Sequence, residues 1–310
     1  MDSKSPIVVT GSHRSGTTWV GKTLCLSNEL GYIFEPFRPA SDARGPAWAD
    51  VPFVYQHIGR ENENAFQPMV EALLDMHYPV RSQIKAVRNP RHVARLGRTY
   101  VASLIYRARG LRPLIKDPFT IFSIEWLVDR FGVQPVVMIR HPAAFAGSLK
   151  RLGWTFDFNQ WMAQPLLIQR YLQPFASDIA EYCNGERDII DQSILLWNGI
   201  HHAICLYQQR HKNWTFLRYE DLAGNPEMGF QELYRTLGLS WNNAVKDQIV
   251  RNTSSDNAPE AVAGDWRLSA RDSRASRNTW HTRLMSNDVE RIKSGTEPIW
   301  TSFYSEDDWV

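Results

Sequence analysis

The sequence predicts an α/β fold in which a mostly parallel central sheet is flanked by helices. Five short apolar runs have the length and the branched or aromatic content of buried strands, at residues 6–10, 32–34, 114–115, 134–139 and 214–217. Helical patterns separate these runs. Alternating strands and helices are typical of parallel sheets, which bind ligands at the carboxyl ends of their strands.

The clearest helical pattern covers residues 188–212, where Ile190, Ile194, Trp197, His201 and Cys205 recur at helical spacing. Further helices are expected after residue 16, before residue 76, over 119–131, from residue 142 and, as a short element, from residue 286.

Composition indicates a globular chain with a sizeable core. Hydrophobic residues make up 43% of the 310 residues and charged residues 22%, which excludes disordered and collagen-like proteins. No repeat or Gly/Ser linker interrupts the chain, so we expect a single domain over residues 1–310. The net charge of +2 argues against nucleic acid as a partner.

Three features bear on the cellular compartment. Cys25, Cys183 and Cys205 contain no CxxC pair and are expected to be reduced thiols. The polar start of the chain leaves no room for a signal peptide, and no run approaches the roughly 20 apolar residues of a transmembrane helix. We therefore expect a cytoplasmic protein without a transmembrane segment.

The loop after the first strand, GSHRSGTTW from residue 11 to residue 19, predicts a phosphate-binding cradle. Backbone N–H groups and a helix amino terminus in this order enclose an oxyanion, although a plain turn is the alternative. The spacing is that of the nucleotide-binding loop GxxxxGK[ST]. Thr17 replaces its lysine, and the cation is Arg14 inside the loop.

A second anion site is predicted where the strand over 134–139 ends. A kinase holds its metal with an aspartate near such a strand end, whereas this chain has Arg140 there and Ser148 two turns into the next helix. An arginine and a hydroxyl together suit a phosphate. Alternatively, Arg140 pairs with a carboxylate and Ser148 lies on a helix surface.

These residues carry a resemblance. The loop from Arg14 to Trp19, the Arg140–Ser148 pair and the segment RYEDL at 218–222 together resemble the sulfotransferases that use 3′-phosphoadenosine 5′-phosphosulfate (PAPS). The resemblance spans most of the chain in the correct order. It implies a P-loop NTPase-like core, PAPS as the sulfonyl donor and 3′-phosphoadenosine 5′-phosphate (PAP) as the product.

The resemblance also implies roles for single residues. The 5′-phosphosulfate would be held by Arg14, Ser15, Gly16, Thr17 and Thr18, and the 3′-phosphate by Arg140 and Ser148, with Trp19, Tyr219 and Thr253 on the adenine side. The basic glycine loop of cytosolic members lacks its glycine here and leaves Arg274 and Arg277 as candidates for completing the 3′-phosphate site. No metal is required, because protein cations suffice for the weakly charged sulfonyl group, and no metal-ligand spacing occurs.

The catalytic base is expected to be Glu35. Cytosolic sulfotransferases use a histidine two residues after a lysine, but Pro118 stands there after Lys116. The tyrosylprotein sulfotransferases and several bacterial and glycan relatives instead have a glutamate 21 residues after the loop arginine, which is the distance from Arg14 to Glu35. The resemblance thus implies Glu35 as base, with Lys116 and Arg14 neutralising the leaving group.

Other interpretations of these residues remain open. Glu35 alternatively serves as a surface acid or as a partner of Arg38. Asp117 is expected to cap a helix before Pro118 rather than to act as a catalytic acid. Three histidines are alternative bases, although such residues are more often structural: His57, His77 and His92.

Residues 38–112 and 154–186 are expected to form the cleft for a hydroxyl-bearing acceptor, a glycan, lipid or small-molecule alcohol. The aromatic residues Trp154, Phe156, Phe158 and Trp161 suit stacking on such a molecule or core packing equally well. From residue 76 to residue 116 there are ten basic residues and no acidic one, which leaves the rest of the chain at −8. This basic segment faces either an anionic acceptor or membrane surface, or acids elsewhere in the fold.

Three functions are therefore considered. The leading one is PAPS-dependent transfer of a sulfonyl group to an acceptor hydroxyl. The alternatives are a divergent P-loop kinase, disfavoured by Thr17 and Arg140, and a non-catalytic sensor that binds PAP.

Overall fold

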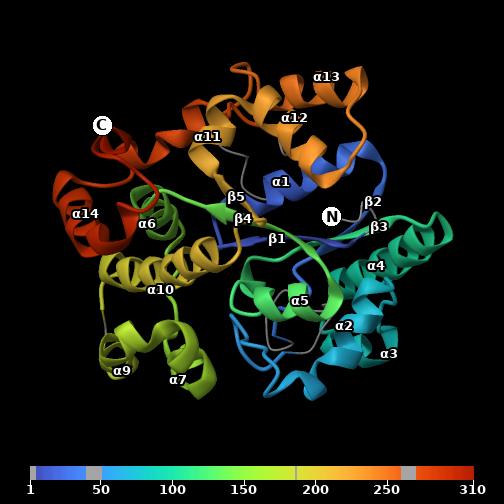
Figure 1. Cartoon of the computed structure of the whole chain (residues 1–310), viewed down its shortest axis with the longest axis horizontal. Helices are drawn as coiled ribbons and strands as arrows, with labels where there is room; N and C mark the ends of the chain where they lie inside the picture. The colour runs from blue at the N-terminus through green and yellow to red at the C-terminus, as the bar shows by residue number, and fades with distance from the viewer. Residues whose placement is uncertain (1–4, 40–50, 186, 260–269) are drawn as a thin grey trace.

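The protein was examined as a computed structural model, which describes residues 5–39, 51–185, 187–259 and 270–310. Its centre is a five-stranded parallel sheet with the order β2-β3-β1-β4-β5 (Figure 1). The strands are β1 (Ile7–Gly11), β2 (Leu30–Phe34), β3 (Arg112–Lys116), β4 (Gln134–Ile139) and β5 (Thr215–Arg218). All five predicted strands are confirmed, each within two residues of its predicted bounds.

Alternate residues of the strands face the two sides of the sheet. On β1, Val8 joins a core cluster with helices α5 (Ile124–Phe131), α6 (Pro142–Leu152) and α10 (Ile189–Arg210), whereas Ile7 and Val9 join a second cluster with α1 (Thr17–Leu24), α12 (Pro226–Leu237) and α13 (Asn243–Thr253). Figure 1 shows these two groups of helices on opposite sides of the sheet. The layered α/β fold predicted from the sequence is confirmed.

The remaining helices lie around this core. They are α2 (Gln67–Leu74), α3 (Val80–Gln83), α4 (Pro90–Ala108), α7 (Asn159–Met162), α8 (Pro165–Leu167), α9 (Ala176–Cys183), α11 (Tyr219–Gly224) and α14 (Ser286–Trp300). The element expected to be short from residue 286 is a helix of 15 residues. No helix among the described residues combines the length and the apolar content needed to cross a bilayer.

Helix α4 is the longest element that the sequence pattern did not reveal. It begins at an Asn89 cap, whose side chain accepts a hydrogen bond from the His92 N–H, and Pro90 occupies its first turn. Only His92 and Ser103 of its 19 residues are buried, and its apolar contact with the core is made by the partly buried Leu96 and Tyr106. The helix lies at the edge of the molecule, beside α2 and α3 (Figure 1).

Candidate functional site

A cavity of about 1190 Å³ opens at the carboxyl ends of the strands. It brings together most of the residues that the sequence singled out. Those that line it are Arg14, Gly16, Thr17, Thr18, Trp19, Glu35, Lys116, Arg140, Ser148 and Tyr219. They come from the ends of β1, β2, β3, β4 and β5 and from the helices that follow, which is where a parallel sheet places its ligands.

The loop between β1 and α1 has the backbone geometry of an anion cradle. Arg14 and Gly16 have φ angles of 65° and 91°, in the left-handed region, and Gly16 caps α1. A Cβ atom on Gly16 would stand 2.6 Å from Cδ2 of Tyr219, so only glycine fits there. The Ser15 hydroxyl donates to the Ser12 carbonyl at 2.6 Å and holds the turn closed.

Arg14 joins the two anion sites that were predicted separately. Its Nε donates to the Ser148 hydroxyl at 2.9 Å, so the first loop and helix α6 meet at one place. Its guanidinium lies 5.6 Å from the ring centroid of Trp154. Burial, together with the neighbouring cations Arg151, Arg140 and Arg271, lowers the pKa of Arg14 to about 10. Several arginines therefore lie close together at this part of the cavity.

Arg140 lies flat on Tyr219, with its guanidinium carbon 3.6 Å from the ring centroid. Its Nε is 3.4 Å from the Glu220 carboxylate, an ion pair without hydrogen-bond geometry. Glu220 is thus the kind of carboxylate partner that the alternative interpretation expected, but Arg140 still lines the cavity. Burial opposes ionisation of Tyr219, yet Arg140 and Arg271 outweigh it and lower the pKa of the phenol.

Three further arginines lie near Arg14 and Arg140 and were missed by the sequence analysis, whereas Arg38, Arg95 and Arg98 line the part of the cavity expected to bind an acceptor. The three, Arg151, Arg271 and Arg283, all line the cavity, and Arg271 lies 5.8 Å from the Trp19 ring centroid. Burial and the cations around it lower the pKa of Arg283 to about 10. Arg274 and Arg277 do not line the cavity, and the Arg274 side chain donates to the Gly224 carbonyl at 3.3 Å. The basic run from residue 271 to residue 277 was the available signal, but its first arginine is the one that reaches the site.

Several buried hydrogen-bond donors at this end have no partner among the described residues. They are Nε of Arg140, Nε of Arg271 and the indole N–H of Trp19. Buried donors without partners are costly unless a ligand supplies acceptors. A polyanion rich in oxygen acceptors fits this set of residues.

Glu35 and Lys116 form a buried ion pair at the ends of β2 and β3. Lys116 Nζ lies 2.6 Å from Oε1 of Glu35, and the two residues are 1% and 7% exposed. The Glu35 N–H also donates to the Lys116 carbonyl, which continues the sheet pairing while the φ of Glu35 is 43°. This positive φ turns the chain at the strand end, and Glu35 lines the cavity. A solvent-exposed surface acid is thereby excluded.

Asp117 is a structural cap, as its position before Pro118 predicted. Its two carboxylate oxygens accept hydrogen bonds from the N–H groups of Phe37 at 2.6 Å and Phe119 at 2.8 Å. Burial, reinforced by the nearby Glu35, raises the pKa of Asp117 to about 7. The residue stands behind the cavity wall rather than on it.

His13 reaches the cavity and was not considered from the sequence. Its backbone N–H donates to the Tyr55 hydroxyl at 3.2 Å, and the distance from Nδ1 to the same hydroxyl is 2.6 Å. Burial and Arg14 lower the pKa of His13 to about 3, so the ring is neutral near pH 7. The other histidines considered as bases, His57, His77 and His92, do not line the cavity.

Three residues assigned to the nucleotide are placed differently from the rest. Ser15 is fully buried and does not line the cavity. The Thr253 hydroxyl donates to the Ile249 carbonyl at 2.8 Å within α13, and Thr253 does not line the cavity. Trp19 is 1% exposed, and its ring packs edge-on against Tyr219 and Phe230, so only part of it borders the cavity. The role of Thr253 remains a prediction from the sequence.

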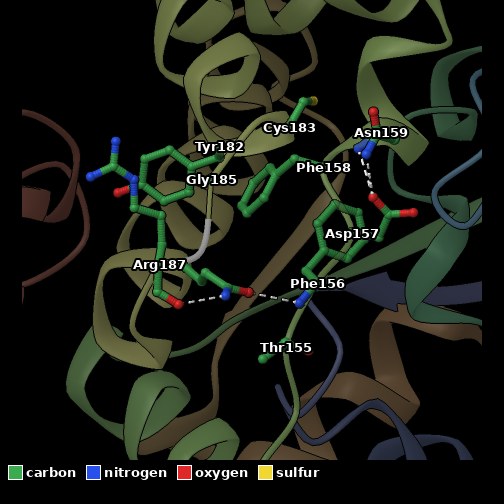
Figure 2. Close-up of a pocket in the computed structure, with 10 residues that line it drawn as sticks. Thr155, Phe156, Asp157, Phe158, Asn159, Tyr182, Cys183, Gly185 and Arg187 are labelled. Atoms are coloured by element: carbon green, nitrogen blue, oxygen red, sulfur yellow. Dashed lines mark hydrogen bonds between the residues drawn. The ribbon is translucent and has the colours of Figure 1, made fainter.

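The far end of the cavity is formed by the segments expected to bind an acceptor. Trp154 is 47% exposed and lines it, whereas Phe158 and Trp161 are buried core residues, so the aromatic cluster divides between the two expected roles. Residues of α4 and of the 154–160 segment complete this end. A smaller pocket of about 420 Å³ shares residues 155–157 with it, and there Gln192 accepts from the Phe156 N–H (Figure 2).

Comparison with known proteins agrees with the geometry. A model of the sulfotransferase family matches residues 6–243. Over 86 residues the chain is 40% identical to carbohydrate sulfotransferase 1 of Danio rerio, a match that covers 28% of this chain and 20% of that protein. The matched part is thus about a fifth of the length of that relative. Among the described residues, no group of three or more His, Cys, Asp or Glu is placed to hold a metal ion.

Solved structures similar to this chain include the sulfotransferase domain of the Synechococcus PCC 7002 olefin synthase, with 15% identity, a TM-score of 0.44 and 98% of each chain covered. They also include mouse sulfotransferase SULT7A1 complexed with PAP, with 13% identity and a TM-score of 0.48, covering 99% of this chain and 87% of that one.

Proposed function

Because this chain belongs to the sulfotransferase family, we propose that it transfers the sulfonyl group of PAPS to an acceptor hydroxyl, with Glu35 as the general base. The observation that carries the proposal is the convergence of Arg14, Arg140 and Arg271 on a cavity that also holds the Glu35–Lys116 pair. The arginines suit a donor with two anionic groups, and a buried carboxylate near them suits deprotonation of an acceptor hydroxyl.

The donor would lie across the amino terminus of α1. The N–H groups of residues 14–18 suit its 5′-phosphosulfate, and Arg140 with Ser148 suits its 3′-phosphate. Arg14 contacts Ser148 directly, so a donor that carries both groups meets one continuous cationic surface. ATP has no 3′-phosphate and would leave the Arg140 side of that surface without a partner.

In the transfer, a bond forms between the acceptor oxygen and sulfur while the bond between sulfur and the bridging phosphate oxygen breaks. Glu35 takes the hydroxyl proton in this step. Lys116 then loses the charge that it faces at 2.6 Å, because protonated Glu35 is neutral. Its ammonium group becomes available to the oxygen that leaves with PAP, and Arg14 neutralises the same oxygen from the loop side.

The kinase and sensor alternatives are supported less well. Thr17 gives the loop no lysine for a terminal phosphate, and Arg140 would repel a metal ion where a kinase needs one. A sensor would have no use for a buried acid and lysine beside the nucleotide. Burying such a pair is costly, and proteins retain such pairs chiefly where they act.

Two measurements test the proposal. PAP should raise the melting temperature of the protein, whereas Mg-ATP should not, because a ligand that binds only the folded state stabilises it by about 2.7 kcal/mol at 100 times its dissociation constant. Labelled PAPS should then be consumed in the presence of a panel of alcohols and glycans. A shift with Mg-ATP alone would overturn the donor assignment, and PAP binding without turnover on any acceptor would favour the sensor.

A further inference from the structure

Helix α4 presents an apolar stripe to solvent instead of to the core. Val93, Tyr100, Val101, Leu104 and Ile105 are between 42% and 57% exposed, and they recur at helical spacing on one face. Six of the fourteen large hydrophobic side chains exposed in the described part of the chain lie between residues 84 and 105. Such clustering marks an interaction surface rather than scattered surface residues.

Cations border this stripe. Arg91 and Arg107 are exposed on α4, and Arg81, Lys85 and Arg88 are exposed just before it. Among the described residues, no carboxylate lies within ion-pair distance of Arg81, Lys85, Arg88, Arg91 or Arg107. For these five residues, the described part of the fold thus offers no acid of the kind that the alternative interpretation required.

An exposed apolar stripe has a specific chemical complement when the cations around it meet no carboxylate in the described part of the chain. We propose that α4 docks the protein on an anionic membrane surface, with the stripe inserted at the level of the lipid headgroups and the cations on the acidic headgroups. A symmetric contact between two copies of α4 would bring two cationic rims together. A soluble polyanion would leave the apolar side chains in water.

The placement of α4 connects the docking surface to the cavity. Thr99, Ala102 and Tyr106 of the same helix line the acceptor end, on the side of α4 away from the stripe. Docking would therefore hold the acceptor end close to the bilayer. Resting on the proposed function, this geometry points to an acceptor hydroxyl carried by a membrane amphiphile.

The test measures binding of the full-length protein to vesicles without donor or acceptor, so its outcome is independent of whether sulfonyl transfer occurs. Binding should be strong to vesicles of phosphatidylcholine mixed with phosphatidylglycerol, weak to phosphatidylcholine alone, and reduced at high salt. Equal binding to both vesicle types, or to neither, would overturn the proposal.

Two paired substitutions examine the two parts of the surface. The double variant Val101→Asp with Leu104→Asp should lower the vesicle partition coefficient about a hundredfold, since it removes apolar insertion and adds repulsion. The double variant Arg91→Ser with Arg107→Ser should lower it about thirtyfold, since each arginine near an anionic surface contributes about fivefold. None of these four residues lines the cavity, so thermal stabilisation by PAP should persist in both variants.

Matched controls lie on other faces of the molecule. Met228→Asp with Val250→Asp changes two comparably exposed apolar residues, and Arg60→Ser with Arg130→Ser removes two exposed arginines; both should bind vesicles like the wild type. A dimer in sedimentation that the Val101/Leu104 variant dissociates would overturn the proposal in favour of self-association. The protein should also be tested on heparin, a soluble polyanion. Heparin binding that is salt-sensitive, as strong as vesicle binding and unchanged in the Val101/Leu104 variant would overturn the proposal in favour of a soluble glycan.

Discussion

The two ends of the cavity are built from different parts of the fold. The end that we propose binds the donor includes side chains that follow strands, such as Arg14 after β1 and Arg140 after β4, and these are fixed by the parallel sheet. The end that we propose binds the acceptor includes α4 and the 154–160 segment, which lie outside the sheet. A sheet can hold the residues for a donor that many enzymes share, while the segments outside the sheet vary with the acceptor.

The largest expected effect concerns Glu35, at the boundary between the two ends. Glu35→Gln should lower turnover between a hundredfold and about ten-thousandfold, the usual range for a lost general base, because Gln cannot take the proton. Thermal stabilisation by PAP should remain. Steady-state rates with labelled PAPS measure the loss, and Asp157→Asn serves as a carboxylate control elsewhere on the cavity wall. Near-normal turnover of Glu35→Gln would show that Glu35 is not the general base.

Arg140 tests whether the donor end recognises a 3′-phosphate. Arg140→Ala should weaken PAP binding by about a hundredfold, the cost of losing a buried partner of a charged group. The affinity for adenosine 5′-phosphate, which lacks the 3′-phosphate, should change much less. Calorimetric titration of both nucleotides gives the two ratios. Equal losses for both would assign Arg140 to packing against Tyr219 instead of to the phosphate.

A smaller effect separates two arginines that lie three residues apart. Arg271→Ala should weaken PAP binding about tenfold, because Arg271 lines the cavity and carries a buried donor without a partner in the described structure. Arg274→Ala, at a position turned toward Gly224, should leave binding unchanged. Weaker PAP binding by Arg274→Ala than by Arg271→Ala would show that Arg274, rather than Arg271, contacts the donor.

A further prediction concerns the pH dependence of stability and does not involve the ligands. Burial lowers the pKa values of His141 and His201 to about 3, so between pH 3 and 6.5 the unfolded chain binds protons that the folded chain does not. Stability should therefore fall as the pH drops below 6.5, by about 1.4 kcal/mol per pH unit for each histidine. The raised pKa of Asp117 has the opposite effect between pH 3.8 and about 7, because there the folded chain binds a proton that the unfolded chain does not. Asp117 therefore makes the pH dependence of stability less steep.

Chemical denaturation at several pH values measures that slope. His141→Phe should reduce the slope by the contribution of one proton. The rings of Trp280, Tyr304 and Trp309 enclose His141, and neither of its ring nitrogens has a hydrogen-bond partner in the described structure. His77→Phe, outside this cluster, is the control. An unchanged slope in His141→Phe would mean that the histidine titrates normally in the folded protein.

The sequence could predict the donor end because strand, loop and helix occur there in a local order. Recognising where a strand ends was enough to place the residues from Arg14 to Trp19 and the Arg140–Ser148 pair. Arg271, Arg151 and Arg283 could not be predicted, because their distance from Arg14 depends on how remote segments pack. His13 was missed because its role depends on Tyr55, 42 residues away.

The acceptor end resisted prediction for a different reason. Helix α4 carries its apolar stripe outward, so a pattern search that assumes a buried stripe finds no partner for it. The basic composition of the segment was visible, but composition does not separate cations that face a partner from cations paired within the fold. Only the positions of Arg91 and Arg107 relative to the described carboxylates decide between these two cases.

The carboxylate of Glu220 links the end of the chain to the donor site. It accepts from the His141 N–H at 3.2 Å and from the Tyr304 hydroxyl at 2.9 Å, and it pairs with Arg140. Tyr304 thus holds Glu220, and through it Arg140, in place from outside the cavity. Tyr304→Phe would remove one of these three contacts of Glu220 and so loosen the support of Arg140 without changing a residue that lines the cavity.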